Sequence, residues 1–174
     1  MTRGACSTMA DVGVDTIDLA SHYHSVRSMQ PRFPNRLFES FPGEIYLYPT
    51  DDQIDGTPID SLPNEVPRFK DSLAEIVGSA DGVGIDVNGW VVLFHNSRLG
   101  ARYPVYRSES AYSDPQNHAF CPSHPEVREY IAAVIDAVAD RGVAEIQLEK
   151  DGFPTVFHGH CREFGHDKRE AFTA

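Results

Sequence analysis

The chain has 174 residues, of which 41% are hydrophobic and 24% charged, and its formal net charge is −11. This length suffices for one domain with a hydrophobic core, and the acidic balance argues against nucleic acid or an anionic membrane as a partner. The sequence holds no apolar run long enough for a membrane span and no secretory signal at its amino terminus, so a cytoplasmic location is expected.

The acidic character comes with a shortage of lysine. Lysine occurs only at positions 70, 150 and 168, whereas arginine occurs twelve times, and Asp outnumbers Glu by 15 to 11. Such a surface suits a protein that must stay hydrated in strong salt, so a halophilic source is one interpretation, and an ordinary acidic protein from a GC-rich genome is the other. The three cysteines show no CxxC spacing, which predicts free thiols rather than a disulfide scaffold.

The amino-terminal part of the chain supplies two predicted strands. Residues 1–12 are expected to be disordered. Residues 14–24 alternate apolar and polar side chains, which indicates a strand, and residues 43–50 form a β-rich apolar run that indicates a second. Prolines interrupt residues 28–38, which are expected to be extended, and residues 51–67 are expected to be an acidic loop.

Two helices and two further strands follow. Apolar side chains at helical spacing predict helices over residues 68–82 and 124–141. Residues 86–96 hold a near-continuous apolar run, as in a strand buried on both faces of a parallel sheet. Alternation predicts a last strand over residues 143–149, and the segment 97–123 is expected to be one long loop.

The second helix has a start signal of its own. Ser123 and Glu126 have the spacing of a capping box, and Pro125 fits the first turn, where no backbone donor is needed. The element order is therefore β, β, α, β, α, β. Strands that alternate with helices predict an α/β fold with about four parallel strands, crossover helices and long loops.

The passage CPSHPEVREYIAAVIDAVADRGVAEIQLE, residues 121–149, carries a family resemblance. It resembles a recurring passage of the glycoside-hydrolase-like TIM barrels, the hypothetical glycosidases, in which P-x-x-P-E-V-R-x-Y precedes a helix and a strand that ends in an acidic residue. The chain departs from that pattern at Ala144-Glu145, where the family has Asp and then Gly. The matching residues are Pro122, Pro125, Glu126, Val127, Arg128, Tyr130, Gly142, Val143, Ile146 and Glu149.

Two upstream segments extend the resemblance. Residues 90–100 are similar to the preceding barrel strand and its loop, and residues 20–27 to the end of the first strand. A closed barrel needs eight strands, and the resemblance covers the first four. It implies a partial (β/α)8 TIM barrel over residues 1–174, a single incomplete domain whose residues 150–174 form an irregular, His-rich tail.

In TIM barrels the active site lies at the carboxyl ends of the strands, and this rule selects the candidate residues. Glu149 is the candidate catalytic carboxylate, acting as acid, nucleophile or base; alternatively it is a strand-end Glu paired with Lys150 or an arginine. His22 and His24, two residues apart, are expected to face the same side. Trp90 is assigned to the core because it is expected at the start of its strand. The candidate substrate-binding residues are His22, His24, Tyr48, His95, Asn96, Arg98, His158 and His160.

Other chemistry has weaker signals. His158, His160, Cys161 and His166 are ligand types that zinc accepts, but their spacing fits no standard motif, so neither a metal site nor a cofactor is expected. His95 and Asn96 have the alternative of bonding loop backbone groups. The sequence has no nucleotide-binding glycine motif and no serine-hydrolase motif.

Three functional hypotheses remain. The first is a glycoside-hydrolase-like protein, the amino-terminal half of a carbohydrate-active hydrolase that is inactive alone, with a carbohydrate as the substrate. The second is a truncated or split-gene half-barrel without a catalytic role, whose open sheet is completed by a homodimer or by a separately encoded carboxyl-terminal half. The third is a small metal-binding protein that uses the carboxyl-terminal histidines.

Overall fold

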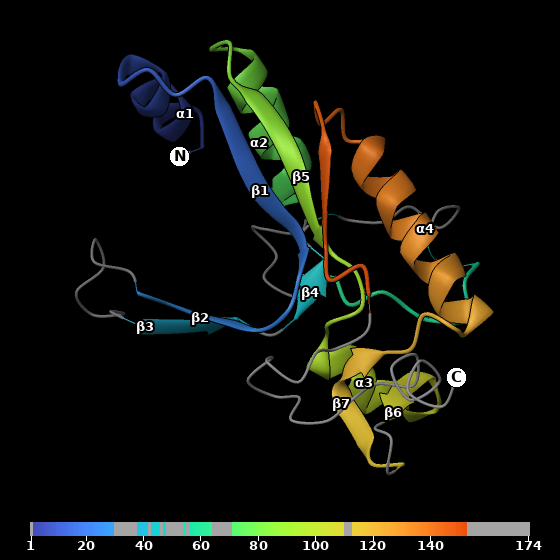
Figure 1. Ribbon diagram of the computed structural model, residues 1–174. Helices are drawn as coiled ribbons and strands as arrows, with labels where there is room; N and C mark the ends of the chain where they lie inside the picture. The colour runs from blue at the N-terminus through green and yellow to red at the C-terminus, as the bar shows by residue number, and fades with distance from the viewer. Residues whose placement is uncertain are drawn as a thin grey trace.

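A four-stranded sheet forms the centre of the computed structural model, with the strand order β4-β1-β5-β8 (Figure 1). The structure describes residues 2–29, 38–41, 43–45, 47, 54, 56–63, 71–109 and 113–152. Strands β1 (Thr16–Tyr23), β5 (Asp86–Val92) and β8 (Ile146–Glu149) are parallel, and the short β4 (Glu44–Ile45) pairs antiparallel with the end of β1.

Two helices connect the parallel strands and cover one face of the sheet. Helix α2 (Ser72–Asp81) leads into β5, and α4 (Pro125–Ala139) leads into β8. Val87, Gly89 and Val91 of β5 alternate toward the helices and are buried. A Cβ added to Gly89 would lie 2.5 Å from Val138 of α4, so glycine allows this helix to approach the strand closely.

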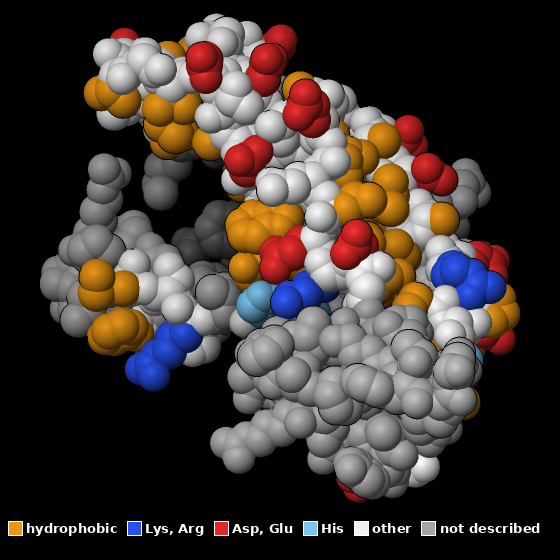
Figure 2. All heavy atoms as spheres, in the orientation of Figure 1, with side chains coloured by type: hydrophobic (Ala, Val, Ile, Leu, Met, Phe, Trp, Pro, Cys, Tyr) orange, Lys and Arg blue, Asp and Glu red, His pale blue; other side chains and the backbone are white. Residues whose placement is uncertain are grey.

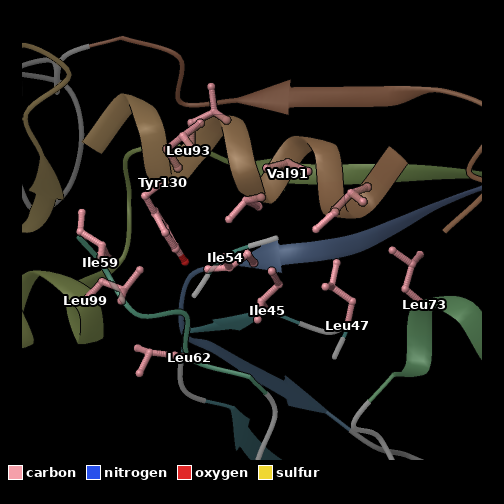
Figure 3. Packing of buried hydrophobic residues seen from close by; sticks show 14 of the residues in the cluster. Ile45, Leu47, Ile54, Ile59, Leu62, Leu73, Val91, Leu93, Leu99 and Tyr130 are labelled. Carbon is pink, nitrogen blue, oxygen red and sulfur yellow. The ribbon is translucent and has the colours of Figure 1, made fainter. Parts of the chain in front are cut away.

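The hydrophobic core lies between the sheet and these helices. Its largest fully buried side chain is Tyr130 of α4. Figure 3 shows Tyr130 above a group of aliphatic side chains that come from the sheet, from α2 and from the segments between β4 and α2. The labelled members of this core are Ile45, Leu47, Ile54, Ile59, Leu62, Leu73, Val91, Leu93, Leu99 and Tyr130.

Smaller elements surround the sheet. The ribbon of β2 (Val26–Met29) and β3 (Phe38–Phe41) projects away from it in Figure 1. A second ribbon pairs β6 with β7 and lies near the carboxyl ends of the parallel strands. The remaining elements are α1 (Thr2–Asp11), α3 (Ser97–Arg102), the 3-10 helix η3 (Pro104–Tyr106), β6 (Arg107–Glu109) and β7 (Pro115–Phe120).

The prediction of an α/β fold with parallel strands and connecting helices is confirmed, but the described part of the chain contains three parallel strands rather than four. The predicted strand over residues 43–50 contributes β4, which has two residues and runs antiparallel to β1. Its β-rich composition signals extended backbone, and composition does not determine the direction in which a strand pairs.

The expectation of a single long loop over residues 97–123 is wrong. This segment contains α3, η3, β6 and β7. Disorder over residues 1–12 is also not found, because Thr2–Asp11 forms α1, whose Cys6 is buried in the core. Of the expected His-rich tail, residues 153–174 lie outside the described part of the chain.

The predicted capping box at Ser123 is absent. Helix α4 begins at Pro125 with His124 at the N-cap, and no side chain caps it. Instead, Nη1 of Arg128 donates hydrogen bonds to the carbonyl oxygens of Pro122 and Ser123, at 2.7 and 2.9 Å. A side chain within the helix therefore fixes the approach of the preceding turn. None of the described helices is long and apolar enough to cross a membrane.

Candidate functional site

The face of the sheet that points away from α2 and α4 carries mainly polar side chains. The register places Asp18, Asn88, Trp90, Gln147 and Glu149 on this face, which we call the open face, and at its carboxyl end also Val92, which is fully buried. Nδ2 of Asn88 donates to Oδ1 of Asp18 at 2.9 Å and so ties β5 to β1. Figure 2 shows acidic and hydrophobic side chains side by side over the sheet region.

Five aromatic rings follow one another at the carboxyl end of the parallel strands. Trp90 meets Tyr23 edge to face at 5.0 Å between ring centroids, and Tyr23 stacks on His24 at 4.3 Å. His24 stacks on His95 at 4.8 Å, and His95 meets His118 edge to face at 5.2 Å. We call Trp90, Tyr23, His24, His95 and His118 the ring row. Its members come from the end of β1, from β5 and the residues after it, and from β7.

Glu149 ends β8 next to the ring row. Burial, and secondly the negative charge of Glu149, raises the pKa of Tyr23 above its usual value, so the carboxylate lies close to this ring. The Oε2 atom of Glu149 is buried and has no hydrogen-bond partner among the described residues. The same is true of Nε1 of Trp90. Among the described residues, a buried acceptor and a buried donor thus remain unpaired at the carboxyl end of the strands.

Three of the predicted site residues come together here, namely His24, His95 and Glu149. Asn96 lies next to them in sequence, but its Oδ1 accepts hydrogen bonds from the backbone N–H groups of Arg98 and Leu99, both at 3.1 Å, and caps α3. Asn96 is buried, and its Nδ2 has no partner within the described part of the chain. Arg98 contributes its backbone to this cap. The oxygen of Asn96 is therefore structural.

His22 does not join the site, and the prediction that it lies with His24 is wrong. A register shift between Ala20 and His22 turns its ring toward α4, where it is 1% exposed. Its Nδ1 donates to the carbonyl oxygen of Val92 at 2.7 Å, and its Nε2 accepts from the hydroxyl of Tyr130 at 3.3 Å. Burial, opposed by the Val92 carbonyl, lowers the pKa of His22 to about 4. Both ring nitrogens are occupied, so His22 is a core residue.

Tyr48, His158 and His160 lie outside the described residues, as do the carboxyl-terminal histidines and Cys161 considered as metal ligands. Within the described ranges, no group of three or more His, Cys, Asp or Glu side chains is arranged to hold a metal ion. The stacked rings of His24 and His95, with 19° between their planes, belong to a stack rather than to a set of ligands around one point.

Two members of the ring row, Trp90 and His118, are absent from the predicted site. Trp90 was assigned to the start of its strand, but β5 begins at Asp86 and Trp90 is the fifth of its seven residues. The alternation in DVNGWVV carries a usable signal, because period two places Trp90 on the face of Asn88 rather than that of the buried Val87. His118 lies in β7, within the segment expected to be a loop, and no sequence signal identifies it.

No protein-family model matches the sequence, and no curated protein matches it. Among solved structures, the chain is similar to a hypothetical protein from Ruminiclostridium thermocellum, with 15% identity and a TM-score of 0.54 over 88% of this chain and 71% of that one. It is similar to the noncanonic maltogenic alpha-amylase AmyB from Thermotoga neapolitana, with 16% identity and a TM-score of 0.53. It is also similar to alpha-L-fucosidase isoenzyme 2 from Paenibacillus thiaminolyticus, with 15% identity and a TM-score of 0.59.

The matches cover only part of the length of each of the two enzymes. The amylase match covers 88% of this chain and 35% of the amylase, and the fucosidase match covers 99% of this chain and 23% of the fucosidase. The chain therefore spans less than half of either enzyme. At these identities the likeness shows only that part of each of the two glycoside hydrolases has the same fold as this chain.

Proposed function

We propose that the chain is a glycoside-hydrolase-like protein that forms the amino-terminal half of a carbohydrate-active hydrolase, with Glu149 as a catalytic carboxylate. One observation carries the proposal: Oε2 of Glu149 is buried and unpartnered among the described residues, at the end of a parallel strand and beside the ring row. The ends of parallel strands are where α/β barrels place their reactive groups.

The chemistry of the position agrees with this role. A buried carboxylate oxygen without a hydrogen bond is unfavourable by about 1–3 kcal/mol, so a substrate group that supplies the bond is favoured there. Glycoside hydrolysis uses two carboxylates that flank the scissile bond, as acid and as nucleophile or base. Imidazole and phenol groups in the ring row, such as those of His24, His95 and Tyr23, offer hydrogen-bonding atoms to sugar hydroxyls. The likeness to an amylase and a fucosidase supports the same reaction class.

The sheet itself supports the half-barrel part of the proposal. Parallel sheets are ordinarily covered on both faces, whereas here the helices α2 and α4 cover one face. On that helical side, Leu148 of β8 is 48% exposed. A further strand and helix beyond β8 would cover Leu148, and closure of the sheet into a barrel would enclose the open face. The second carboxylate would come with them, so we expect this chain to bind sugar without hydrolysing it.

The proposal is tested by measuring binding and hydrolysis separately. Isothermal titration with maltose and with L-fucose should detect binding of at least one of these sugars, and the 4-nitrophenyl glycosides of glucose and fucose should not be cleaved. Replacing Glu149 by Gln should weaken binding about tenfold, because it removes a charge-assisted hydrogen bond. The matched control is Glu145→Gln, at an exposed position just before β8, which should bind like the wild type.

Two results would contradict the proposal. One is the absence of binding of either sugar to the wild-type chain. The other is equal binding by the wild type and the Glu149→Gln variant, because the carboxylate would then not contact the ligand.

A further inference from the structure

Two buried polar atoms on the open face have complementary chemistry. The Nε1–H of Trp90 can only donate a hydrogen bond, and an ionised Glu149 carboxylate can only accept one. Neither Nε1 nor Oε2 has a partner among the described residues. Both side chains as a whole are only partly buried, so each reaches the surface of the molecule while these atoms do not.

The register places the two side chains next to each other. Trp90 pairs with Gln147, and Glu149 lies two residues further along β8 on the same face. The spacing between strands and the rise along a strand put their Cα atoms about 8 Å apart. At this separation the two long side chains can contact a small ligand group from opposite sides. Both also adjoin Tyr23: the Trp90 ring is 5.0 Å from its ring, and the Glu149 charge acts on its hydroxyl.

A ligand group that satisfies both atoms must accept one hydrogen bond and donate another at the same time. A hydroxyl accepts from the indole N–H and donates to the carboxylate at the same time. A carboxylate or phosphate accepts from Trp90 but is repelled by Glu149, and an ammonium donates to Glu149 but leaves the indole N–H unpaired. Each unmade bond costs about 1–3 kcal/mol, so the unsatisfied pair discriminates among ligands.

We propose that Trp90 and Glu149 form a paired binding site for an uncharged sugar hydroxyl, and that Trp90 is a specificity residue which favours neutral over acidic sugars. This inference rests on the proposed function, to which it adds a residue and a substrate class. The Tyr23 ring, held edge to face against Trp90, keeps the indole in place beside Glu149.

The composition of the chain provides a direct readout. Trp90 is the only tryptophan in the sequence, so the ¹⁵N-labelled protein has a single indole N–H resonance. Titration with maltose or L-fucose should shift this resonance in a saturable way, because the hydrogen becomes bonded. The same concentration of D-glucuronate should shift it much less, because its carboxylate is repelled by Glu149 even where one of its hydroxyls reaches the pair.

A pair of variants separates the hydrogen bond from the ring. Trp90→Phe keeps an aromatic ring against Tyr23 but removes the N–H, and its affinity for the neutral sugar should fall about tenfold. Glu145→Gln, at an exposed position just before β8, leaves both paired groups intact and should bind like the wild type. Circular dichroism tests whether each variant is folded. If Trp90→Phe does not fold, the shift of the indole resonance in the wild-type protein still tests whether Trp90 contacts the sugar.

The outcomes distinguish this inference from the proposed function. If a neutral sugar shifts the backbone amides around Glu149 while the indole resonance stays fixed, the Trp90 inference is wrong and the proposed function stands. An equal indole shift with D-glucuronate would overturn the selectivity for neutral sugars. If no neutral sugar binds at all, both proposals fail together.

Discussion

His22 shows how burial changes the behaviour of a titratable side chain. Its imidazole is enclosed by β1, β5 and α4, and it bonds Val92 through Nδ1 and Tyr130 through Nε2. Since the Val92 carbonyl can only accept, Nδ1 carries a proton, and the pKa of about 4 leaves Nε2 unprotonated at neutral pH, so the ring is neutral. The folded chain therefore resists a second proton, which the unfolded chain accepts at a pKa of 6.5.

We predict that acid destabilises the fold through His22. Because the pKa falls from 6.5 in the unfolded chain to about 4 in the folded chain, this stabilisation is complete above pH 6.5 and is lost progressively between pH 6.5 and pH 4. The loss amounts to about 3 kcal/mol. Urea unfolding at pH 7 and pH 4.5 measures it, with His22→Asn as the control, in which a neutral amide replaces the imidazole. An equally large acid effect in the control would show that other groups are responsible.

Single residues also mark the limit of sequence-based prediction. His24, His95 and Glu149 follow strands in sequence, and the topology brings such positions to one edge, so these three could be predicted. His22 could not be excluded from the site, because the register shift that turns it toward α4 leaves no mark in the sequence. Trp90 was misplaced because the predicted strand extends to residue 96, whereas β5 ends at Val92, two residues after the tryptophan.

Among the elements, α3 and β7 make an unusually close contact. A Cβ added to Gly100 of α3 would lie 2.1 Å from the carbonyl oxygen of Asn117 in β7, which is backbone and cannot turn away. This contact fixes the β6–β7 ribbon, and with it His118, relative to the end of β5. The ring row depends on it, because His118 reaches His95 from β7.

We expect Gly100→Ala to destabilise the protein by at least about 2 kcal/mol, since the added methyl group must push α3 away from β7. Gly78→Ala in α2 is the matched control, because no atom lies within 4 Å of the added Cβ. In that helix alanine should stabilise by about 0.5–1 kcal/mol. Urea midpoints of the two variants at neutral pH test the difference, and similar midpoints would disprove the role of the close contact.

The elements differ in how well sequence predicts them. Helices α2 and α4 were predicted because each repeats apolar side chains over more than two turns. The segment 97–123 was not, because α3 has six residues and β6 three, too few to establish a period. Their positions depend instead on tertiary contacts, such as the Asn96 cap and the bond from Nε of Arg107 to the Gly100 carbonyl at 2.7 Å.

At the scale of the whole molecule, the sheet is built asymmetrically. Sequential parallel strands could be predicted, because strands joined by helices pair side by side. The antiparallel β4 could not, since two residues carry no directional signal. Leu148 and Val91 are paired in register on the helical side, yet Leu148 is 48% exposed and Val91 fully buried.

This asymmetry predicts that substitutions at Val91 and Leu148 change the free energy of unfolding by very different amounts. Val91→Ala should destabilise the chain by about 2 kcal/mol, because it removes two buried methyl groups and leaves a cavity. Leu148→Ser should change the free energy of unfolding by less than about 0.5 kcal/mol, because the side chain already meets solvent. Thermal or urea unfolding of both variants decides, and a large loss for Leu148→Ser would show that the outer side of β8 is covered in solution.

The ring row also has a consequence for the timing of motions. Its rings belong to segments that are distant along the chain, so the row exists only while β1, β5 and the β6–β7 ribbon are all docked. The ribbon has just two strands, one of them three residues long, and such units open more readily than a central sheet. Opening of the ribbon would release His118 without unfolding the parallel strands. The candidate site would then lose and regain its arrangement many times while the parallel sheet stays folded.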